Sequence, residues 1–350
     1  MSRALLYCAG GGIGDSLVAS VVARALHQRF AIVDALTLPG HRETLERVPD
    51  LDGVLVDDGG DERALAAHLA ARAYDACVVT WATPRAARVP QAAQIPVRVG
   101  QARRLYSYRF TKRIVVRSEL GNVTSHWTDI LLDYARALGC DTADRAYRFV
   151  PTPADEREAA AVAASTGWLR NGHSGSFVIL NPCNAIASQR GVWPVDGWAA
   201  LAGALQARFD APILISGGPG DVSIVETVLR KARAYDSPGS APDQGRMSSV
   251  AGKVGIGAFG ALARNARAFV GITTGSMHVA AAVGCPTVGI FPFQSDFPER
   301  WAPLGARTAV VRPSYPCHPR DTKETCSDYA CVANLDVARI LAATDAVTGD

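Results

Sequence analysis

A strand, a glycine turn and a helix open the chain, and this arrangement most constrains the fold. Residues 4–8 form a continuous apolar run that predicts a buried strand, and four of residues 10–15 are glycines. Apolar residues in 16–30 then follow helical spacing. Short apolar strands alternate with helical patterns along the rest of the chain. Because that alternation is typical of a parallel sheet with helices on both faces, we expect an α/β fold.

The remaining predicted elements form two groups. In the first group we expect strands over residues 32–38, 54–56, 76–80 and 114–116, and helices over 63–72 and 129–138. In the second group we expect strands over residues 177–181, 212–216, 268–272 and 286–291, and helices over 195–209, 222–234 and 276–283. Residues 236–257 are rich in Gly, Ser and Pro and predict a long loop.

A polar segment between the groups predicts a domain boundary. The chain has 350 residues, a length that suits two domains. We expect a first domain over residues 1–160, a second over 176–331, and a last helix and tail over 332–350. The sequence leaves open whether this tail packs back on the first domain. Two Rossmann-like domains would face each other across a cleft, with ligands beyond the carboxyl ends of the strands.

Charge and hydropathy exclude several classes of protein. The formal net charge is only +3, so a nucleic-acid partner is not expected. No apolar run approaches the roughly 18–20 residues of a membrane span, and the first residues do not resemble a signal peptide. Cys8, Cys77 and Cys285 lie in or beside apolar runs, which predicts free buried thiols and a cytoplasmic, reducing location.

The first glycine turn ends in an acid, Asp15. Glycines there let the backbone approach a ligand, and the helix start offers free N–H groups. The dinucleotide fingerprint needs glycine in place of Asp15, so a nucleotide-dependent oxidoreductase is disfavoured. Asp15 either caps the helix or presents a carboxylate that accepts a proton. The residues alone favour the cap.

A second turn, after predicted strand 268–272, predicts an anion site. Thr273, Thr274 and Ser276 supply hydroxyls, and Gly275 permits close backbone approach. His278 falls in the first helical turn and can add a donor. The alternatives are that the hydroxyls cap the helix and that His278 is a hydrogen-bonded core histidine. We favour phosphate binding for the set.

Two further turns of the second half carry polar side chains. Gly218 and Asp221 follow strand 212–216, where an acid either holds ribose hydroxyls or caps a helix. Asn181 ends strand 177–181, and Arg190 beyond it can meet phosphate. Trp193 is interpreted as packing at a helix start.

A basic run lies in the first half, and four cysteine or histidine residues lie near the end. Residues 97–117 contain no acid, and we predict that this run contacts an anionic acceptor or anionic lipid. The alternative is that the run is a solvated loop. The run comprises Arg98, Arg103, Arg104, Arg109, Lys112, Arg113 and Arg117, with Tyr106 and Tyr108 interleaved. The late group lacks the paired spacing of zinc sites, so no metal site is predicted. Its members are Cys317, His318, Cys326 and Cys331, and the three cysteines are the candidate ligands if a metal binds.

In this order, the motifs resemble glycosyltransferase family 9, the ADP-heptose:lipopolysaccharide heptosyltransferases. The resemblance covers nearly the whole chain, and residues 274–282 are its most specific part. The other matching segments are residues 12–17 (G-x-G-D-x-L), 126–129, 138–139, 193–194, 217–219, 284–288 and 291, with the cysteine-bearing tail from 316 to 331 and the helix 337–344 after it.

The resemblance implies the GT-B architecture, with the sugar nucleotide on the second domain and the acceptor on the first. It implies that Asp15 is the general base of an inverting transfer, with an ADP-sugar donor and no required cofactor. It further implies a lipopolysaccharide core or related glycan acceptor, and a cytoplasmic location, peripheral on the inner membrane face. The donor-side residues are Asn181, Arg190, Gly218, Asp221, Thr273, Thr274, Gly275, Ser276 and His278. The acceptor-side residues are Gly12, Gly14, Arg98, Arg103, Arg104 and Lys112.

Two positions depart from the family pattern. Thr273 stands where the family often has Asp, and Gly191 stands where a lysine usually precedes the tryptophan by two residues. Arg190 is adjacent, but a guanidinium is not equivalent to an ammonium. Both departures lie on the donor side. They leave open a different donor, or a family member that binds a nucleotide sugar without turnover.

Overall fold

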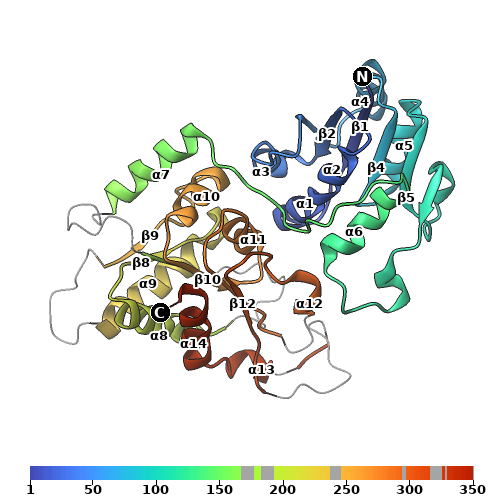
Figure 1. The fold of residues 1–350 in the computed structure, drawn as a ribbon. Helices are drawn as coiled ribbons and strands as arrows, with labels where there is room; N and C mark the ends of the chain where they lie inside the picture. The colour runs from blue at the N-terminus through green and yellow to red at the C-terminus, as the bar shows by residue number, and fades with distance from the viewer. Residues whose placement is uncertain are drawn as a thin grey trace. The chain divides into compact units, whose positions relative to one another are not determined.

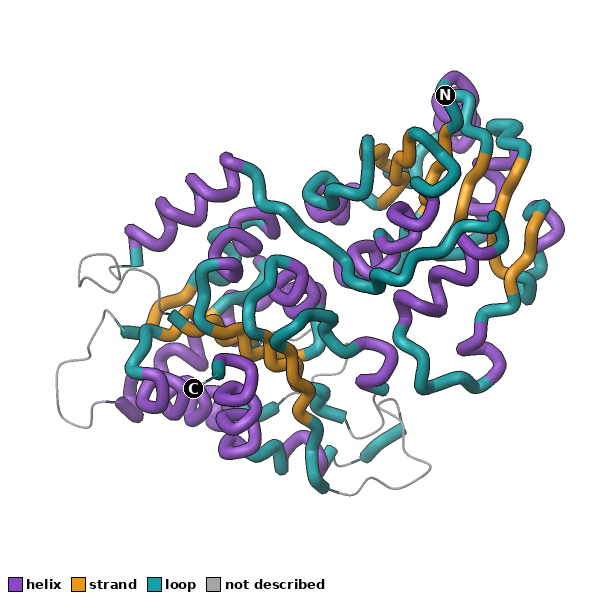
Figure 2. The backbone as a smooth tube through the Cα atoms, in the orientation of Figure 1, coloured by secondary structure: helices purple, strands orange, loops and turns teal. Residues whose placement is uncertain are grey.

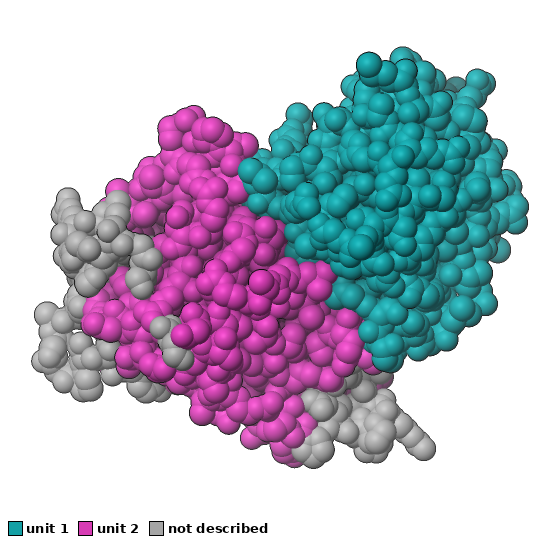
Figure 3. Space-filling view, viewed as in Figure 1, with its two compact units in different colours: residues 1–150 teal, residues 151–350 magenta. Residues whose placement is uncertain are grey.

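The structure is a computed structural model that describes residues 1–166, 177–182, 193–236, 246–293, 297–315, 325–327 and 329–349. The chain divides into two compact units, Met1–Val150 and Pro151–Asp350, which Figure 3 colours separately. Each unit contains one six-stranded sheet with helices packed on it (Figures 1 and 2). The predicted α/β class is therefore confirmed.

The sheet of unit 1 has the strand order β3-β2-β1-β4-β5-β6, and every pairing is parallel. The order reverses between β1 and β4, as in a Rossmann fold. The central strands read as continuous apolar runs because helices bury both of their faces. The strands are β1 (Arg3–Tyr7), β2 (Ile32–Thr37), β3 (Gly53–Val56), β4 (Ala76–Val79), β5 (Val97–Gln101) and β6 (Lys112–Ile114).

Several helices of unit 1 differ from the prediction. The single helix expected over 16–30 is two helices, α1 (Ile13–Ala19) and α2 (Val21–Leu26). At the break, the Ser20 hydroxyl donates to the Leu17 carbonyl at 2.6 Å, a local bond that competes with the helix. The other helices are α3 (Arg42–Leu45), α4 (Glu62–Ala71), α5 (Pro84–Ala92) and α6 (Trp127–Arg136).

The sheet of unit 2 has the order β12-β11-β10-β7-β8-β9, again parallel throughout. Counted from its first strand, this is the same order as in unit 1, with the reversal between β7 and β10. The strands are β7 (Val178–Asn181), β8 (Ile213–Ile215), β9 (Met247–Ser249), β10 (Ala268–Ile272), β11 (Thr287–Ile290) and β12 (Thr308–Val311).

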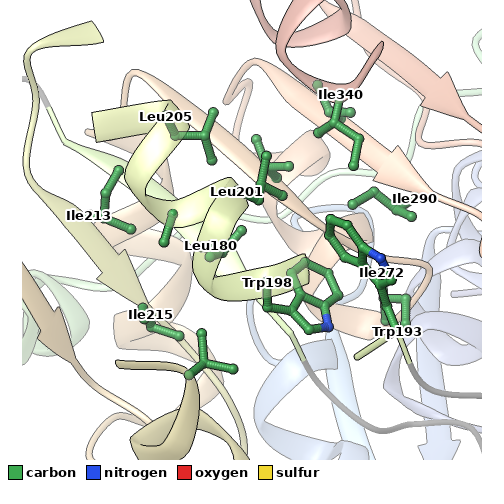
Figure 4. Close-up of a cluster of buried hydrophobic side chains, with 14 of the residues drawn as sticks. Leu180, Trp193, Trp198, Leu201, Leu205, Ile213, Ile215, Ile272, Ile290 and Ile340 are labelled. Atoms are coloured by element: carbon green, nitrogen blue, oxygen red, sulfur yellow. The ribbon is translucent and has the colours of Figure 1, made fainter. Parts of the chain in front are cut away.

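Helices of unit 2 enclose a core that includes two tryptophans. Figure 4 shows Trp193 and Trp198 packed with Leu201 and Ile272, and the two indole centroids lie 4.8 Å apart. The interpretation of Trp193 as a packing residue is confirmed. The helices are α7 (Pro153–Ser165), α8 (Val195–Phe209), α9 (Val222–Asp236), α10 (Ile256–Arg264), α11 (Gly275–Ala282), α12 (Pro298–Trp301), α13 (Ala330–Ala333) and α14 (Val337–Thr348).

The division falls after Val150, whereas the sequence placed the end of the first domain at residue 160. The reason is helix α7, which packs on α10 and therefore belongs to unit 2. Glu156 pairs with Arg264 at 2.5 Å, and Glu158 accepts the Gly255 amide at 3.1 Å.

The last helix, α14, also belongs to unit 2. It packs on β11, β12 and α8, with Ile340 fully buried. The sequence had left open a return of this tail to the first domain, and that return stays a prediction. Among the described residues, each helix is too short or too polar to span a bilayer.

Candidate active site

Polar turns of both units lie at the points where the strand order reverses. In unit 1 these turns follow β1 and β4, and in unit 2 the described turn, residues 273–276, follows β10. Ligands of open α/β sheets bind at this position, because neighbouring crossovers run to opposite faces and leave a crevice there. The sequence-predicted Asp15 and the group from Thr273 to His278 therefore stand where a ligand site is expected.

Asp15 lies in the first turn of α1, which begins at Ile13, so it is not the residue that precedes the helix. Its Oδ2 accepts the Gly12 amide at 2.7 Å, a capping bond made from inside the helix. Gly11 has φ +68°, and a Cβ there would lie 2.5 Å from Asp15 Oδ2. Glycine at 11 is thus required both by the backbone and by the closeness of the carboxylate.

The surroundings of Asp15 change its acidity. Burial raises the pKa of the Asp15 carboxyl above its ordinary value, although the Gly12 amide and nearby His41 act in the opposite direction. His41 is itself buried, which lowers its pKa, and its Nδ1 lies 2.9 Å from the Ser16 hydroxyl. A carboxylate of raised pKa is a better proton acceptor near neutral pH. Sequence reasoning missed His41, because nothing in the pattern around it marks its approach to Asp15.

Trp81, which follows β4, is a second residue that sequence reasoning missed. A Cβ on Gly10 would lie only 2.0–2.3 Å from three atoms of its five-membered ring. The indole therefore lies against the glycine turn that leads to Asp15. The side chain is nonetheless 42% exposed.

In unit 2, the turn between β10 and α11 gathers exposed hydroxyls at a helix start. Residues 273–276 are all partly exposed, and the Thr274 and Ser276 hydroxyl oxygens lie 2.7 Å apart. Thr274 is the residue before α11 and its side chain makes no capping bond to the helix. The amides of Gly275 and Ser276 are in the first turn, where no intrahelical acceptor exists. This arrangement suits a phosphate group.

His278 and Asn181 are more buried than the prediction implied. His278 is only 4% exposed, as the alternative of a core histidine requires. Asn181, at the end of β7, is 2% exposed and donates through Nδ2 to the Ser216 hydroxyl at 2.8 Å. Its Oδ1 is buried and has no hydrogen-bond partner within the described ranges. Arg190 and Gly191 lie outside the described residues.

Asp221 repeats the local geometry of Asp15. It ends the short 3₁₀ helix Pro219–Asp221 before α9, and its Oδ2 accepts the Gly218 amide at 2.9 Å. The interpretation of Asp221 as a capping residue is therefore confirmed. Asp221 follows β8, one strand away from the reversal in the sheet.

The basic run is not a loop, because it contains β5 and β6. Arg98, in β5, donates to the Ile95 and Arg109 carbonyls. Lys112, in β6, donates to the Ala137 carbonyl at 2.8 Å, and Arg104 pairs with Glu119 at 2.7 Å. Three of the four predicted acceptor-side cations thus make local structural contacts. Arg103 is exposed.

The thiols in the described part of the chain are structural. Cys8, Cys77 and Cys285 are buried and free, as predicted. Cys331 is buried in the core of unit 2, and Cys326 accepts the Tyr329 amide at 3.3 Å. Within the described residues no group of three or more His, Cys, Asp or Glu side chains is placed to hold a metal ion. Cys317 and His318 lie outside them.

Two parallel sheets of Rossmann order, each with a polar turn at its reversal point, place the chain in the α/β class with the GT-B architecture. Residues 62–330 match the family model described as glycosyltransferase family 9 (heptosyltransferase). The chain belongs to this family, and it is a glycosyltransferase. No curated protein sequence matches the chain.

Solved structures share the fold over nearly the whole chain. The ADP-heptose lipopolysaccharide heptosyltransferase II of E. coli is 18% identical, with a TM-score of 0.78 over 99% of this chain and 98% of that one. The family 9 glycosyltransferase of Veillonella parvula is 16% identical, with a TM-score of 0.80 over 99% and 97%. The E. coli heptosyltransferase WaaC with ADP is 17% identical, with a TM-score of 0.65 over 89% and 93%.

Proposed function

We propose that this protein is an inverting transferase that moves heptose from ADP-heptose to a lipopolysaccharide core or a related glycan. The single observation that carries the proposal is the hydroxyl-lined start of α11 at the reversal point of the second sheet. The solved structures similar to this chain include a heptosyltransferase with ADP and an ADP-heptose lipopolysaccharide heptosyltransferase.

On the donor side, the α11 turn binds the diphosphate of the nucleotide sugar. The Thr274 and Ser276 hydroxyls and the Gly275 amide donate to phosphate oxygens, and the helix dipole favours their negative charge. The same groups stabilise ADP as it leaves. His278 and Asn181 hold the turn and the end of β7 in place, and Asp221 binds the ribose.

On the acceptor side, Asp15 acts as the general base. The acceptor hydroxyl attacks the anomeric carbon, its proton passes to the Asp15 carboxylate, and the bond from that carbon to the diphosphate breaks. Gly12 and Gly14 keep the turn free of side chains that would block the acceptor. Arg103 is the exposed cation available for an anionic acceptor, since Arg98, Arg104 and Lys112 have local partners.

The donor is tested by thermal denaturation with ADP-, UDP- and GDP-sugars, followed by mass analysis of the glycan. A donor that binds the folded state raises the melting temperature by mass action. We expect the largest rise with ADP-heptose, together with one added heptose on a core oligosaccharide and release of ADP. A rise with UDP- or GDP-sugars alone would overturn the assignment of the donor.

We further propose that unit 1 contacts an anionic membrane surface through residues 103–123. Large apolar side chains gather there on the exposed surface, among them Leu105 (99% exposed) and Tyr108 (63%). Arg103 and Arg113 are exposed in the same segment. Apolar side chains interleaved with cations bind the surface of anionic bilayers. Sedimentation with phosphatidylglycerol vesicles should fall several-fold for Leu105→Ser, and binding to phosphatidylcholine vesicles alone should be weak; equal binding to both would contradict the proposal.

A second candidate function is binding of a nucleotide sugar without turnover. The observation that favours it is Thr273, which stands where the family often has Asp. Calorimetry that detects ADP-heptose binding, with no ADP release in the presence of any core oligosaccharide, would establish this alternative.

A further inference from the structure

Trp81 is an exposed aromatic residue that lies against Gly10, in the glycine turn that leads to Asp15. A Cβ built on Gly10 would meet Trp81 Cδ1, Nε1 and Cγ at 2.0, 2.2 and 2.3 Å. These nearly equal distances put Gly10 under one face of the five-membered ring. The residue is 42% exposed, so the contact with Gly10 leaves part of Trp81 open to solvent.

The sheet fixes this contact. β1 and β4 are paired in parallel with Tyr7 opposite Val79, and the Thr80 amide donates to the Tyr7 carbonyl at 3.1 Å. Trp81 and the glycine turn therefore leave the same sheet edge side by side. The residue after Trp81 is also held, because the Tyr106 hydroxyl donates to the Ala82 carbonyl at 2.6 Å. The last bond joins the Trp81 turn to the segment that carries Arg103.

Trp81 is exposed, and it is not one of the buried residues of the apolar cluster that includes Tyr7, Val79 and Phe110. An immobilised indole with an open surface is a common element of carbohydrate sites, because the C–H groups of a sugar ring pack against an aromatic face. Its position at the reversal of the sheet is where ligands bind in such folds.

We propose that Trp81 is the stacking platform for the acceptor sugar, a residue that binds a pyranose ring and presents its hydroxyl to Asp15. The ligand class is a phosphorylated or carboxylated oligosaccharide, because the platform is joined through Tyr106 to the segment with exposed Arg103. This inference rests on the proposed function for the role of Asp15, but binding to the platform requires no turnover.

Steady-state kinetics with a lipid-free core oligosaccharide test the platform. For Trp81→Ala and Trp81→Leu we expect the acceptor KM to rise at least tenfold, with the ADP-heptose KM and the melting temperature nearly unchanged. Trp81→Phe, which retains an aromatic face, should stay within about threefold of the wild type. Tyr315→Ala removes a similarly exposed aromatic side chain (45%) from unit 2 and serves as the matched control. An unchanged acceptor KM in Trp81→Leu, or a rise confined to the donor KM, would overturn the proposal.

Fluorescence separates this inference from the proposed function. The chain has six tryptophans, and the oligosaccharide should change the emission of the wild type but not that of Trp81→Phe. If no heptose is transferred and this change persists, the platform stands and the proposed reaction fails. If heptose is transferred and both proteins respond equally, the reaction stands and the platform is wrong. Gly10→Ala should reproduce the loss, because the added Cβ would displace the indole.

Discussion

Asp15 and Asp221 hold the same local geometry in the two units, and yet their surroundings differ. Each carboxylate accepts the backbone amide three residues before it, from Gly12 at 2.7 Å and from Gly218 at 2.9 Å. Asp15, however, follows the strand at the reversal of its sheet, and burial raises its pKa. Both units thus have an acid at a helix terminus. Of the two acids, only Asp15 lies at the reversal point, where a general base is expected.

The pair supplies a matched test of the general base. Asn can accept the same amide hydrogen bond but cannot take a proton, so Asp15→Asn should keep the fold and lower kcat at least a hundredfold. Asp221→Asn should leave kcat within a few-fold and raise the ADP-heptose KM. Both variants are measured by ADP release at saturating acceptor. Transfer by Asp15→Asn at the wild-type rate would remove Asp15 from the mechanism.

The raised pKa of Asp15 predicts the acid side of the pH profile. The residue accepts a proton only when ionised, so kcat/KM for the acceptor should fall as the pH drops through a value above the roughly 3.9 of an ordinary aspartate. His41 lowers the pKa of Asp15 through its charge, so His41→Gln should move this limb to higher pH. A limb at or below the ordinary value would contradict the assignment.

The raised pKa of Asp15 also makes stability depend on pH, in the opposite direction from that of a salt-bridged acid. Because folding favours the protonated carboxyl, Asp15 stabilises the fold below the pKa of the unfolded chain, and this is lost as the pH rises through the folded-state pKa. Asp15→Asn should therefore melt higher than the wild type at neutral pH, and the difference should shrink near pH 3. Thermal denaturation across this range measures it.

Substitution of two glycines of positive φ distinguishes the effect of backbone strain from that of contact with Asp15. Gly11 has φ +68° and a Cβ there would meet the Asp15 carboxylate, whereas Gly59 has φ +81° with open space around its Cβ position among the described residues. Both substitutions to Ala should cost about 1–2 kcal/mol for the left-handed backbone. Only Gly11→Ala should also abolish transfer, because the carboxylate must move. Urea denaturation and ADP release distinguish the two, and equal loss of activity would show that the contact is irrelevant.

The central elements of both units were predictable from sequence, and the edges were not. Strand β10 and helix α8 match the expected residues at both ends, because their apolar patterns are continuous and bounded by turns. Strand β6 (Lys112–Ile114) was expected over 114–116, because its first two residues, Lys112 and Arg113, are charged. As an edge strand it needs no apolar side chains on its open side.

Residues of the candidate site were predictable only where they lie together in a single turn of the sequence. Asp15 and the 273–278 turn are each encoded in a few consecutive residues. The pairing of β1 with β4 brings Trp81 to the first turn, and the hydrogen bond with the Ser16 hydroxyl brings His41 there. Both are contacts between distant parts of the sequence. Likewise, the local partners of Arg98 and Lys112 could be seen only after folding.

A cluster around Asp129 predicts how unit 1 responds to acid. Arg117, Arg136 and Arg145 all lie within 3.1 Å of its carboxylate. Burial alone would raise the pKa of Asp129, but the hydrogen bonds from Arg136 and Arg117 outweigh it and bring the pKa to about 2. A depressed pKa contributes stability that is present above the pKa of the unfolded chain and is lost as the pH falls toward about 2.

Asp129→Asn should therefore lower the free energy of unfolding at pH 7 by about 1–2 kcal/mol, because the pKa difference sets an upper limit of roughly 2 kcal/mol and solvent screens part of it. The loss should shrink as the pH falls toward 2, where about half of the wild-type carboxylates are also protonated. Asp52→Asn serves as the comparison, because this acid is more exposed, lies 3.7 Å from His27 and accepts the Val33 amide at 2.7 Å. Urea denaturation at pH 7, 4 and 2.5 measures both, and a loss for Asp129→Asn that is independent of pH would show that packing, not charge, holds this cluster.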